Sequence, residues 1–173
     1  PLDYYFRSKN EMPETEIRAL DLCRGEILDV GAGVGSHSLI LQDDHSVTAL
    51  DFSQHLCEIM AHRGVNLILN HDIYKYSGNE KYDTILLLMN GLGIAQDPTG
   101  LLSLFSKLSR MLKNNGQIIF ESSDISYLYE GDTKPTDRYF GEIEYRYEYQ
   151  GQKTEWFSWL YADRNLVKEV SKK

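Results

Sequence analysis

Residues 26–37 read Glu26-Ile-Leu-Asp-Val-Gly-Ala-Gly-Val-Gly-Ser-His37 and carry the clearest signal for the fold class. Its first five residues form a short apolar strand that carries Asp29 near its end and runs into a Gly-x-Gly-x-Gly turn. Glycine adopts positive φ angles without a steric penalty and lets a ligand approach the backbone, while a following helix presents free N–H groups. The stretch therefore predicts a strand, a glycine turn and a helix, with a nucleotide-like ligand at the turn.

The spacing of these glycines argues against one large class of nucleotide-binding enzymes. A dinucleotide-binding fingerprint requires Gly-x-Gly-x-x-Gly. Counting from Gly31 places Ser36 at the third glycine position, and counting from Gly33 places Ser38 there. The turn therefore disfavours a nicotinamide- or flavin-dependent enzyme.

Strand and helix patterns alternate on both sides of this stretch. The expected elements are helix 14–24, strand 26–30, helix 36–42, strand 46–51, helix 54–63, strand 65–69, strand 82–89, helix 101–112 and strand 117–121. Such alternation is typical of an α/β fold with a doubly wound, Rossmann-like, mostly parallel sheet. Ligands of such sheets bind at the carboxyl ends of the strands.

The sequence after the fifth strand has a different pattern, which predicts an inserted antiparallel hairpin at residues 140–162. Its halves are expected at 142–149 and 154–161, joined by a turn at 150–153. Tyr145, Tyr147 and Tyr149 would share one face, either as a stripe packed on the main sheet or as an aromatic wall over a substrate site. A helix begins at residue 166 and is still incomplete where the sequence stops, so we expect a domain truncated at its C-terminus.

Length and charge exclude several function classes. The 173 residues fit a single domain rather than two independent cores. Lys and Arg number 18 against 26 Asp and Glu, so no basic excess is available to bind a phosphate backbone or anionic lipid. The apolar runs are much shorter than the roughly 18 residues that span a bilayer, and no secretory signal is visible. Nucleic acid and membranes are therefore not expected as partners.

The cysteines and histidines show no metal-ligand spacing, so no metal site is expected. Cys23 and Cys57 lie in separate helix-like segments without a CxxC motif, and we expect buried free thiols, which suit the cytoplasm. His37 and His71 are different from the other histidines because both fall near strand ends. Either could act as a general base.

With these motifs in this order, the chain resembles the class I S-adenosylmethionine-dependent methyltransferases, whose first motif is an acidic residue followed by Gly-x-Gly-x-Gly. Here that motif reads Asp29-Val-Gly31-Ala32-Gly33-Val-Gly35. The resemblance gives Asp51, at the end of the second strand, the role of accepting both ribose hydroxyls of the cofactor. Phe52 and Ser53 follow where the family packs an apolar residue against the adenine.

The resemblance continues along residues 23–123. At the end of the third strand it gives Asp72 the adenine amino group, unless Asp72 instead caps its own loop, and it places His71 and Ile73 beside the ring. After the fourth strand it places Asn90 and Gly91 next to the sulfonium. Asn90 thereby joins His37 and His71 as a weak candidate for a catalytic residue, and no catalytic residue is assigned.

In many members of the family that the chain resembles, the residues before the first motif fold over the cofactor. Tyr5 and Arg7 are therefore expected either to close the site or to pack on the sheet edge, and in the first case Arg7 would pair with the cofactor's carboxylate. The resemblance thus implies one domain over residues 1–173, with a cap segment and helix at 1–24, a cofactor-binding core at 25–123 and the hairpin at 140–162.

The activity that the resemblance implies is methyl transfer from S-adenosylmethionine to a small-molecule acceptor, which leaves S-adenosylhomocysteine. In-line displacement at a sulfonium depends on alignment more than on acid or base strength, so few catalytic side chains are needed. Asn90-Gly-Leu-Gly93 stands where many base and glutamine methylators have Asn-Pro-Pro-Tyr, which favours a small acceptor. Two alternatives remain. One is a non-catalytic cofactor-binding or scaffold domain whose aromatic hairpin forms a homodimer or partner interface, and the other is a nicotinamide-dependent oxidoreductase.

Overall fold

The computed structural model of the chain describes residues 2–129, 131 and 134–172. Its residues form two compact units, of which the first is Pro1–Leu88 with Leu108–Phe120 and the second is Met89–Lys107 with Glu121–Lys173. The single domain expected over residues 1–173 stays a prediction, and Lys173 lies outside the described residues.

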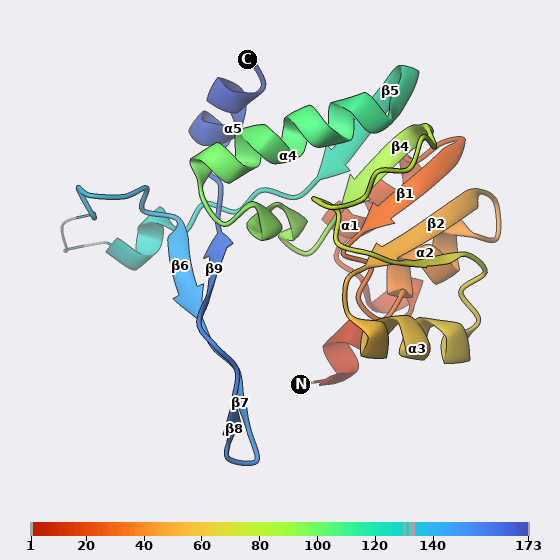
Figure 1. Cartoon of the computed structure of the whole chain (residues 1–173), viewed down its shortest axis with the longest axis horizontal. Helices are drawn as coiled ribbons and strands as arrows, with labels where there is room; N and C mark the ends of the chain where they lie inside the picture. Colours follow the sequence, from red (N-terminus) through yellow and green to blue (C-terminus); the bar gives the residue numbers. More distant parts are fainter. Residues whose placement is uncertain (1, 130, 132–133, 173) are drawn as a thin grey trace. The chain divides into compact units, whose positions relative to one another are not determined.

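The first unit contains a five-stranded sheet in the order β3-β2-β1-β4-β5 (Figure 1). The strands are β1 (Glu26–Val30), β2 (Ser46–Asp51), β3 (Ile68–Asn70), β4 (Tyr82–Leu87) and β5 (Leu112–Phe120). All neighbouring strands are parallel, and in the centre of the sheet Ile27 pairs with both Val47 and Thr84. The chain winds outward from β1 in one direction and then in the other, which confirms the predicted doubly wound α/β topology.

Three helices of this unit cover one face of the sheet: α1 (Glu14–Asp21), α2 (Ser36–Leu41) and α3 (Gln54–Arg63). Buried side chains of α1 and α2 share one cluster with Ile27, Val47 and Leu86, while those of α3 share another with Ala49. These strand residues lie on the same face, because side chains alternate along a strand and paired residues of parallel strands point the same way. On the opposite face, Leu28, Ile85 and Leu87 are also fully buried.

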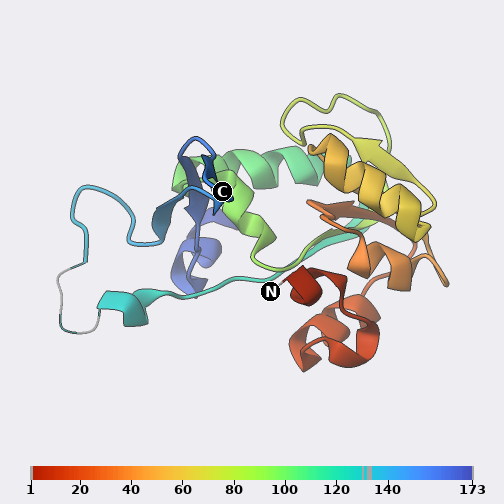
Figure 2. The same ribbon diagram turned by 90° about the horizontal axis from the view of Figure 1, so that it is seen from below.

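Two 3₁₀ turns that the sequence pattern did not predict precede α1. They are η1 (Leu2–Phe6) and η2 (Lys9–Glu11). Figure 2 shows them in red, gathered with α1 beside α2. Short 3₁₀ segments are hard to predict from sequence because they are too brief to show an apolar period.

Some element boundaries differ from the predicted ones for local reasons. β3 begins at Ile68 rather than at residue 65, because Val65 N donates to Met60 O in the C-terminal cap of α3. β5 begins at Leu112 rather than at residue 117, because strand pairing continues across an irregularity in which Asn115 has a φ of 65°.

The second unit contains the antiparallel strands. They form two short ladders, β6 (Glu142–Tyr145) with β9 (Phe157–Leu160) and β7 (Glu148–Tyr149) with β8 (Gln152–Lys153). The predicted hairpin is thus confirmed, but its pairing is interrupted, and Figure 1 shows β7 and β8 at the tip of an arm that extends from β6 and β9. The other elements are η3 (Gly91–Ala95), η4 (Ser126–Tyr129) and α5 (Arg164–Val170), while the residues of α4 (Pro98–Met111) are divided between the units.

The aromatic residues of this hairpin are divided between packing and exposure. Trp159 packs on Gly93 of η3 so closely that a Cβ at Gly93 would overlap the indole ring. Tyr147, Tyr149 and Trp156 are exposed instead.

Within the described ranges of the chain, no helix combines the length and the apolar character needed to cross a membrane.

We expect Gly35→Ala to destabilise the protein more than Gly64→Ala. Both glycines have positive φ angles, 80° and 89°, so each variant carries the left-handed penalty of about 1–2 kcal/mol. A Cβ at Gly35 would also lie 2.7 Å from Val65 Cγ2 and 2.9 Å from Met60 Cγ, whereas at Gly64 no described residue beyond its chain neighbours has an atom within 4 Å. Overpacking should add roughly 1–3 kcal/mol at Gly35, measured by urea unfolding. Equal losses in the two variants would show that Gly35 is not needed for packing against α3.

Candidate functional site

The glycine turn between β1 and α2 has an open side. Gly31 and Gly33 have φ angles of 71° and 59°, and of the described residues other than the immediate chain neighbours, none has an atom within 4 Å of the position where a Cβ would stand on either. The N–H groups of Gly31 and Ala32 donate to Leu50 O at 2.8 and 3.0 Å, which ties the turn to the end of β2. The two glycines therefore expose backbone that a ligand can approach, while Gly35 is used for packing.

Asp51, at the carboxyl end of β2, holds this turn in place. Its Oδ2 accepts from Gly33 N and its Oδ1 accepts from Ser53 N, each at 2.9 Å. Burial raises the pKa of Asp51 above its ordinary value, although the hydrogen bonds from Ser53 and Gly33 act in the opposite direction. The carboxylate thus lies beside the open glycines and is already oriented by the backbone on both sides.

Asp29, the acidic residue of the first motif, is enclosed by protein. Its side chain is buried, and Oδ2 accepts from Ser38 Oγ at 2.6 Å. Burial raises its pKa, and the charge of Asp51 adds to this rise, while His37 and Ser38 act to lower it. Asp29 therefore links β1 to α2 through Ser38 and helps to orient the turn between them.

The residues that follow Asp51 include a large exposed ring. Phe52 is 80% exposed, although it directly follows a buried strand residue. Ser53 is the N-cap of α3, where its Oγ accepts from Leu56 N at 3.4 Å. Phe52 is thus available to pack on a planar group bound at the end of β2.

The loop after β3 is held by its own backbone. His71 N donates to Asp51 O at 3.0 Å, which brings this loop to the end of β2, and Ile73 is buried. Asp72 Oδ1 accepts from Tyr74 N at 2.9 Å, so Asp72 caps its own loop, as one of the two sequence interpretations proposed. A carboxylate oxygen has more than one lone pair, so this bond leaves acceptor capacity on Asp72.

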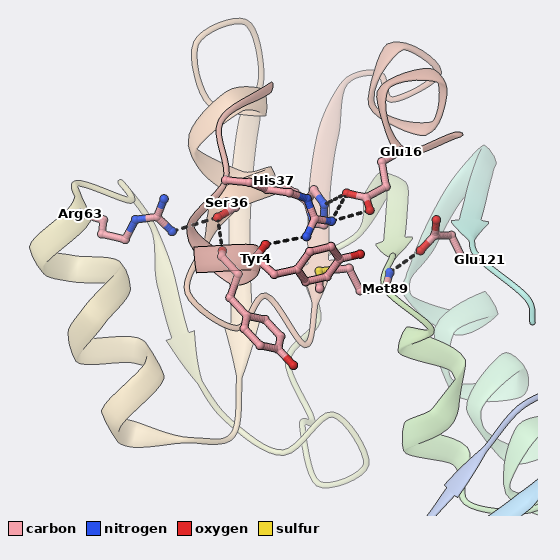
Figure 3. Close-up of polar contacts among 9 residues, drawn as sticks. Tyr4, Glu16, Ser36, His37, Arg63, Met89 and Glu121 are labelled. Carbon is pink, nitrogen blue, oxygen red and sulfur yellow. Dashed lines mark hydrogen bonds and ion pairs between the residues drawn. The ribbon is translucent and has the colours of Figure 1, made fainter. Parts of the chain in front are cut away.

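Arg7 forms a buried cluster with Glu16 and His37. Its guanidinium donates to both carboxylate oxygens of Glu16 and to Tyr4 O. His37 Nε2 lies 3.0 Å from Glu16 Oε2, and Figure 3 shows these two side chains pointing toward one another. Burial acts to raise the pKa of Glu16, but the hydrogen bonds from Arg7 and His37 outweigh it and the pKa is lowered. The guanidinium of Arg7 is thus already paired with the carboxylate of Glu16. Its expected pairing with a cofactor's carboxylate stays a prediction.

A second set of contacts fastens the N-terminal segment to the glycine turn. Ser36 Oγ donates to Tyr5 O at 2.6 Å, while Arg63 donates to Val34 O at 2.6 Å and to Ser36 Oγ at 3.0 Å. The Arg63 guanidinium also lies 5.0 Å from the ring centroid of Phe6. Figure 3 shows Ser36 between Arg63 and the N-terminal segment. The sequence carried no signal for Glu16, Ser36 or Arg63, because their partners are distant along the chain.

Met89 and Asn90, which follow β4, belong to the second unit and have an unusual backbone. Their φ angles are 54° and 58°, in the left-handed region that residues other than glycine rarely adopt. Met89 N donates to Glu121 Oε2, and Asn90 Nδ2 donates to Leu160 O at 3.2 Å. Asn90 and Gly91 were predicted from the sequence, whereas Glu121 was not.

The first unit therefore offers exposed glycine backbone, a strand-end carboxylate and an exposed aromatic ring around the carboxyl ends of β1 and β2. This combination suits a ligand with a planar ring and a diol, since a carboxylate can accept from two hydroxyls at once. In the described part of the chain, no group of three or more His, Cys, Asp or Glu side chains could hold a metal ion.

Comparison with known proteins agrees with this geometry. Residues 27–116 match a family model described as a methyltransferase domain. The crystal structure of an S-adenosylmethionine-dependent methyltransferase from Bacteroides fragilis, in complex with S-adenosylhomocysteine, is 35% identical and superposes with a TM-score of 0.88. The similarity covers 99% of this chain and 72% of that one.

More distant proteins share the fold or part of the sequence. The PH0226 protein from Pyrococcus horikoshii is 20% identical, with a TM-score of 0.67 and coverage of 98% of this chain and 88% of that one. Among curated proteins, a probable cobalt-precorrin-6B C(15)-methyltransferase (decarboxylating) from Thermoplasma acidophilum is 27% identical. That similarity covers 73% of this chain and 69% of the relative.

We expect Asp51→Asn to become more stable relative to the parent chain as pH rises. A carboxyl whose folded-state pKa is raised contributes stability that is present below the unfolded-state pKa, about 3.9, and is lost as pH rises through the folded-state pKa. Asparagine does not ionise, so the variant escapes this loss, although it keeps only one of the two oxygen acceptors. Thermal unfolding of both proteins at pH 4 and pH 7 measures the change.

Asp83→Asn is the matched control, for which we expect the opposite change of stability with pH. The hydrogen bond from Lys113 lowers the pKa of Asp83, so the ionised carboxyl stabilises the fold at neutral pH and this stability is lost on acidification. Asp83→Asn should therefore lose stability relative to the parent as pH rises. A difference between Asp51→Asn and the parent that does not change with pH would contradict a raised pKa at Asp51.

Proposed function

The chain belongs to the methyltransferase-domain family, and from that premise we propose that it transfers a methyl group from S-adenosylmethionine to a small-molecule acceptor by in-line displacement. The S-adenosylmethionine-dependent methyltransferase activity and its cofactor follow from the family match and from the relative that binds S-adenosylhomocysteine. The small acceptor is supported by the net charge of −8, which disfavours nucleic acid, and by the precorrin named for the curated relative.

The open glycine turn beside Asp51 is the observation that supports this function most strongly. Among the described residues other than the immediate chain neighbours, nothing lies within 4 Å of a Cβ on Gly31 or Gly33, so a bound molecule could approach the backbone there. Asp51 would accept both ribose hydroxyls, Phe52 would pack on the adenine, and Asp72 would accept from the adenine amino group with its remaining lone pairs. These residues fit S-adenosylmethionine as a ligand.

The chemistry that the cofactor would supply is a methyl group on a sulfonium, from which the neutral thioether is a good leaving group that needs no activation by the protein. The contribution of the chain is to bind and orient, which can account for about 7–11 kcal/mol of a barrier between well-aligned reactants. Asp29 and Arg63 hold the glycine turn through Ser38 and through Val34 O, respectively. A rigid turn keeps the donor at a fixed angle to the acceptor.

The three candidates for a catalytic residue differ in their surroundings. His37 is buried against Glu16, so a positioning role in the N-terminal cluster suits it better than direct contact with an acceptor. His71 is only partly buried, and its Nδ1 lies 3.0 Å from Asp72 O. We propose His71 as the base for an amine or hydroxyl acceptor, and Asn90 as a residue that binds the cofactor.

Two further proposals concern location and assembly. The cysteines of the described chain are free and buried, as predicted, which is compatible with a cytoplasmic protein.

The exposed Tyr149 and Trp156 on the hairpin would suit a homodimer interface, because aromatic residues are enriched in interface cores. Light scattering across a range of protein concentrations should then show a dimer that Tyr149→Ser with Trp156→Ser converts to a monomer. A parent that is monomeric throughout would contradict the dimer.

Calorimetric titration with S-adenosylhomocysteine tests the cofactor site. We expect the parent to bind at about micromolar Kd, near −8 kcal/mol, and Asp51→Asn to lose at least about tenfold in affinity, since it loses charge and one acceptor oxygen. Parent affinity should also fall as pH is lowered through the raised pKa of Asp51, because the protonated carboxyl accepts from the ribose hydroxyls less well.

Asp97→Asn is a suitable control, since Asp97 is an exposed carboxylate that accepts from Gly100 N at 2.8 Å near the start of α4. It should bind S-adenosylhomocysteine like the parent. NADH should not bind, because the third glycine of the dinucleotide fingerprint is missing. A folded parent that binds NADH but not S-adenosylhomocysteine would overturn the proposed site.

A further inference from the structure

The ladder of β6 and β9, in the second unit, separates aromatic from charged side chains. Tyr145 pairs with Phe157 and Ile143 pairs with Trp159, and the side chains of directly paired residues lie on the same face of an antiparallel ladder. Glu144 stands between Ile143 and Tyr145 and points to the opposite face, because side chains alternate along a strand. The face that carries the paired aromatic rings therefore has no charged residue at these positions.

The rings on this face lie close to one another. The ring centroid of Phe157 is 6.2 Å from that of Tyr145 and 5.4 Å from that of Tyr147, and the ring planes are tilted by 31° and 36°. Trp159 stands almost perpendicular to Phe157, at 84° and 6.4 Å. Spacings and tilts of this kind are favourable for aromatic pairs, so a further planar ring can join the series. We call Tyr145, Tyr147, Phe157, Trp159 and Tyr161 the aromatic cluster.

One end of the aromatic cluster is supported by backbone and the other end is open. A Cβ on Gly93 of η3 would lie 1.9 Å from Trp159 Nε1, so the indole packs directly on that backbone. Phe157 is partly buried, whereas Tyr145 and Tyr147 are 37% and 67% exposed. The packed rings are ordered before any ligand arrives, which lowers the ordering cost of binding, and the exposed rings offer surface to a ligand.

Two phenols give this apolar surface a polar group. The hydroxyl oxygens of Tyr145 and Tyr161 are 3.0 Å apart, so one phenol donates to the other and the pair keeps one O–H without a partner among the described residues. Burial and the hydrogen bond with Tyr145 raise the pKa of Tyr161 to about 12, so this phenol keeps its proton at neutral pH. Sites for small molecules typically combine an apolar, aromatic lining with a few polar groups that fix orientation.

The charges of the hairpin that are nearest in sequence have partners elsewhere. Lys153 pairs with Glu148 at 3.2 Å, and the Arg146 guanidinium lies 4.9 Å from the ring centroid of Trp156, outside the aromatic cluster. Among the described side chains, only other tyrosines act on the pKa of Tyr161. A charged ligand would lose hydration at the aromatic cluster without gaining an ion pair, so the surface favours a neutral one.

We propose that the aromatic cluster binds a neutral, planar aromatic molecule with an oxygen substituent, whose rings pack against Tyr145 and Phe157 and whose oxygen accepts the remaining O–H of the Tyr145–Tyr161 pair. This site lies within the second unit and does not depend on the proposed methyl transfer. The residues proposed above for assembly, Tyr149 and Trp156, are not part of the aromatic cluster. A second copy of the chain is the competing occupant, and the experiment separates the two.

Calorimetric titration with 2-naphthol as the probe tests the aromatic part of the site. We expect saturable binding with a Kd below about 1 mM, and weaker binding of two analogues that each lack one feature. Decahydro-2-naphthol lacks the aromatic rings, and 2-naphthoate carries a charge. Phe157→Leu should weaken 2-naphthol binding roughly three- to tenfold, because it removes an aromatic partner. Trp156→Leu, which changes an aromatic residue outside the aromatic cluster, should bind like the parent.

Tyrosine variants test the hydroxyl contact. Tyr145→Phe or Tyr161→Phe alone leaves one phenol free to donate, so each should keep most of the affinity for 2-naphthol. The double variant removes both donors and should lose about three- to tenfold. Tyr149→Phe is the matched control, since it removes a hydroxyl that accepts from Gln150 Nε2 at 3.2 Å in the hairpin tip, and it should bind normally.

The outcomes are distinct. A parent that does not bind 2-naphthol, or that binds 2-naphthoate equally well, overturns the proposal. Unchanged affinity in both Phe157→Leu and the double tyrosine variant also overturns it. If light scattering shows a dimer that Phe157→Leu converts to a monomer, and neither form binds 2-naphthol, a second copy covers the aromatic cluster and the proposal is wrong. Should Phe157→Leu not fold, the double tyrosine variant and the two analogues still decide the question.

Discussion

The carboxylate of Asp51 connects the two strand ends around which the candidate site is built. It accepts from Gly33 N in the turn after β1 and from Ser53 N at the start of α3. The backbone carbonyl oxygen of Asp51 accepts from His71 N after β3. Three segments that are separate in sequence therefore share one residue. Because this carboxylate is buried among backbone donors, the turn is oriented before any ligand arrives, which lowers the ordering cost of binding.

The N-terminal segment is attached to the same turn from the other side. Arg7, Glu16 and His37 form a buried charged cluster, and breaking such a cluster by removing one partner typically costs about 3–5 kcal/mol. Ser36 adds a hydrogen bond to Tyr5 O. The segment before α1 is thus a fixed part of the first unit, and Arg7 stabilises it through an ion pair rather than presenting a free guanidinium.

Sequence patterns predicted the sheet well because its signals are local. Apolar strands, glycine stops and helical spacing are each read within a few residues, and the order of elements then limits the topology. The resemblance to the methyltransferases added the ligand roles of Asp51 and Asn90, which stay predictions. Neither the patterns nor the resemblance indicated the contacts of Glu121 and Arg63, whose partners Met89 and Val34 are 32 and 29 residues away, because no short motif records a contact at that distance.

The doubly wound α/β core, the methyltransferase motif at Asp29–Gly35 and the residues that follow each strand can thus be read from local sequence patterns. How these residues are used depends on the folded chain. Asp29 is enclosed, Gly31 and Gly33 are open, and Asn90 Oδ1 has no hydrogen-bond partner among the residues that the structure describes. Such differences between residues of one motif depend on burial and on long-range hydrogen bonds, which exist only after distant segments have packed together.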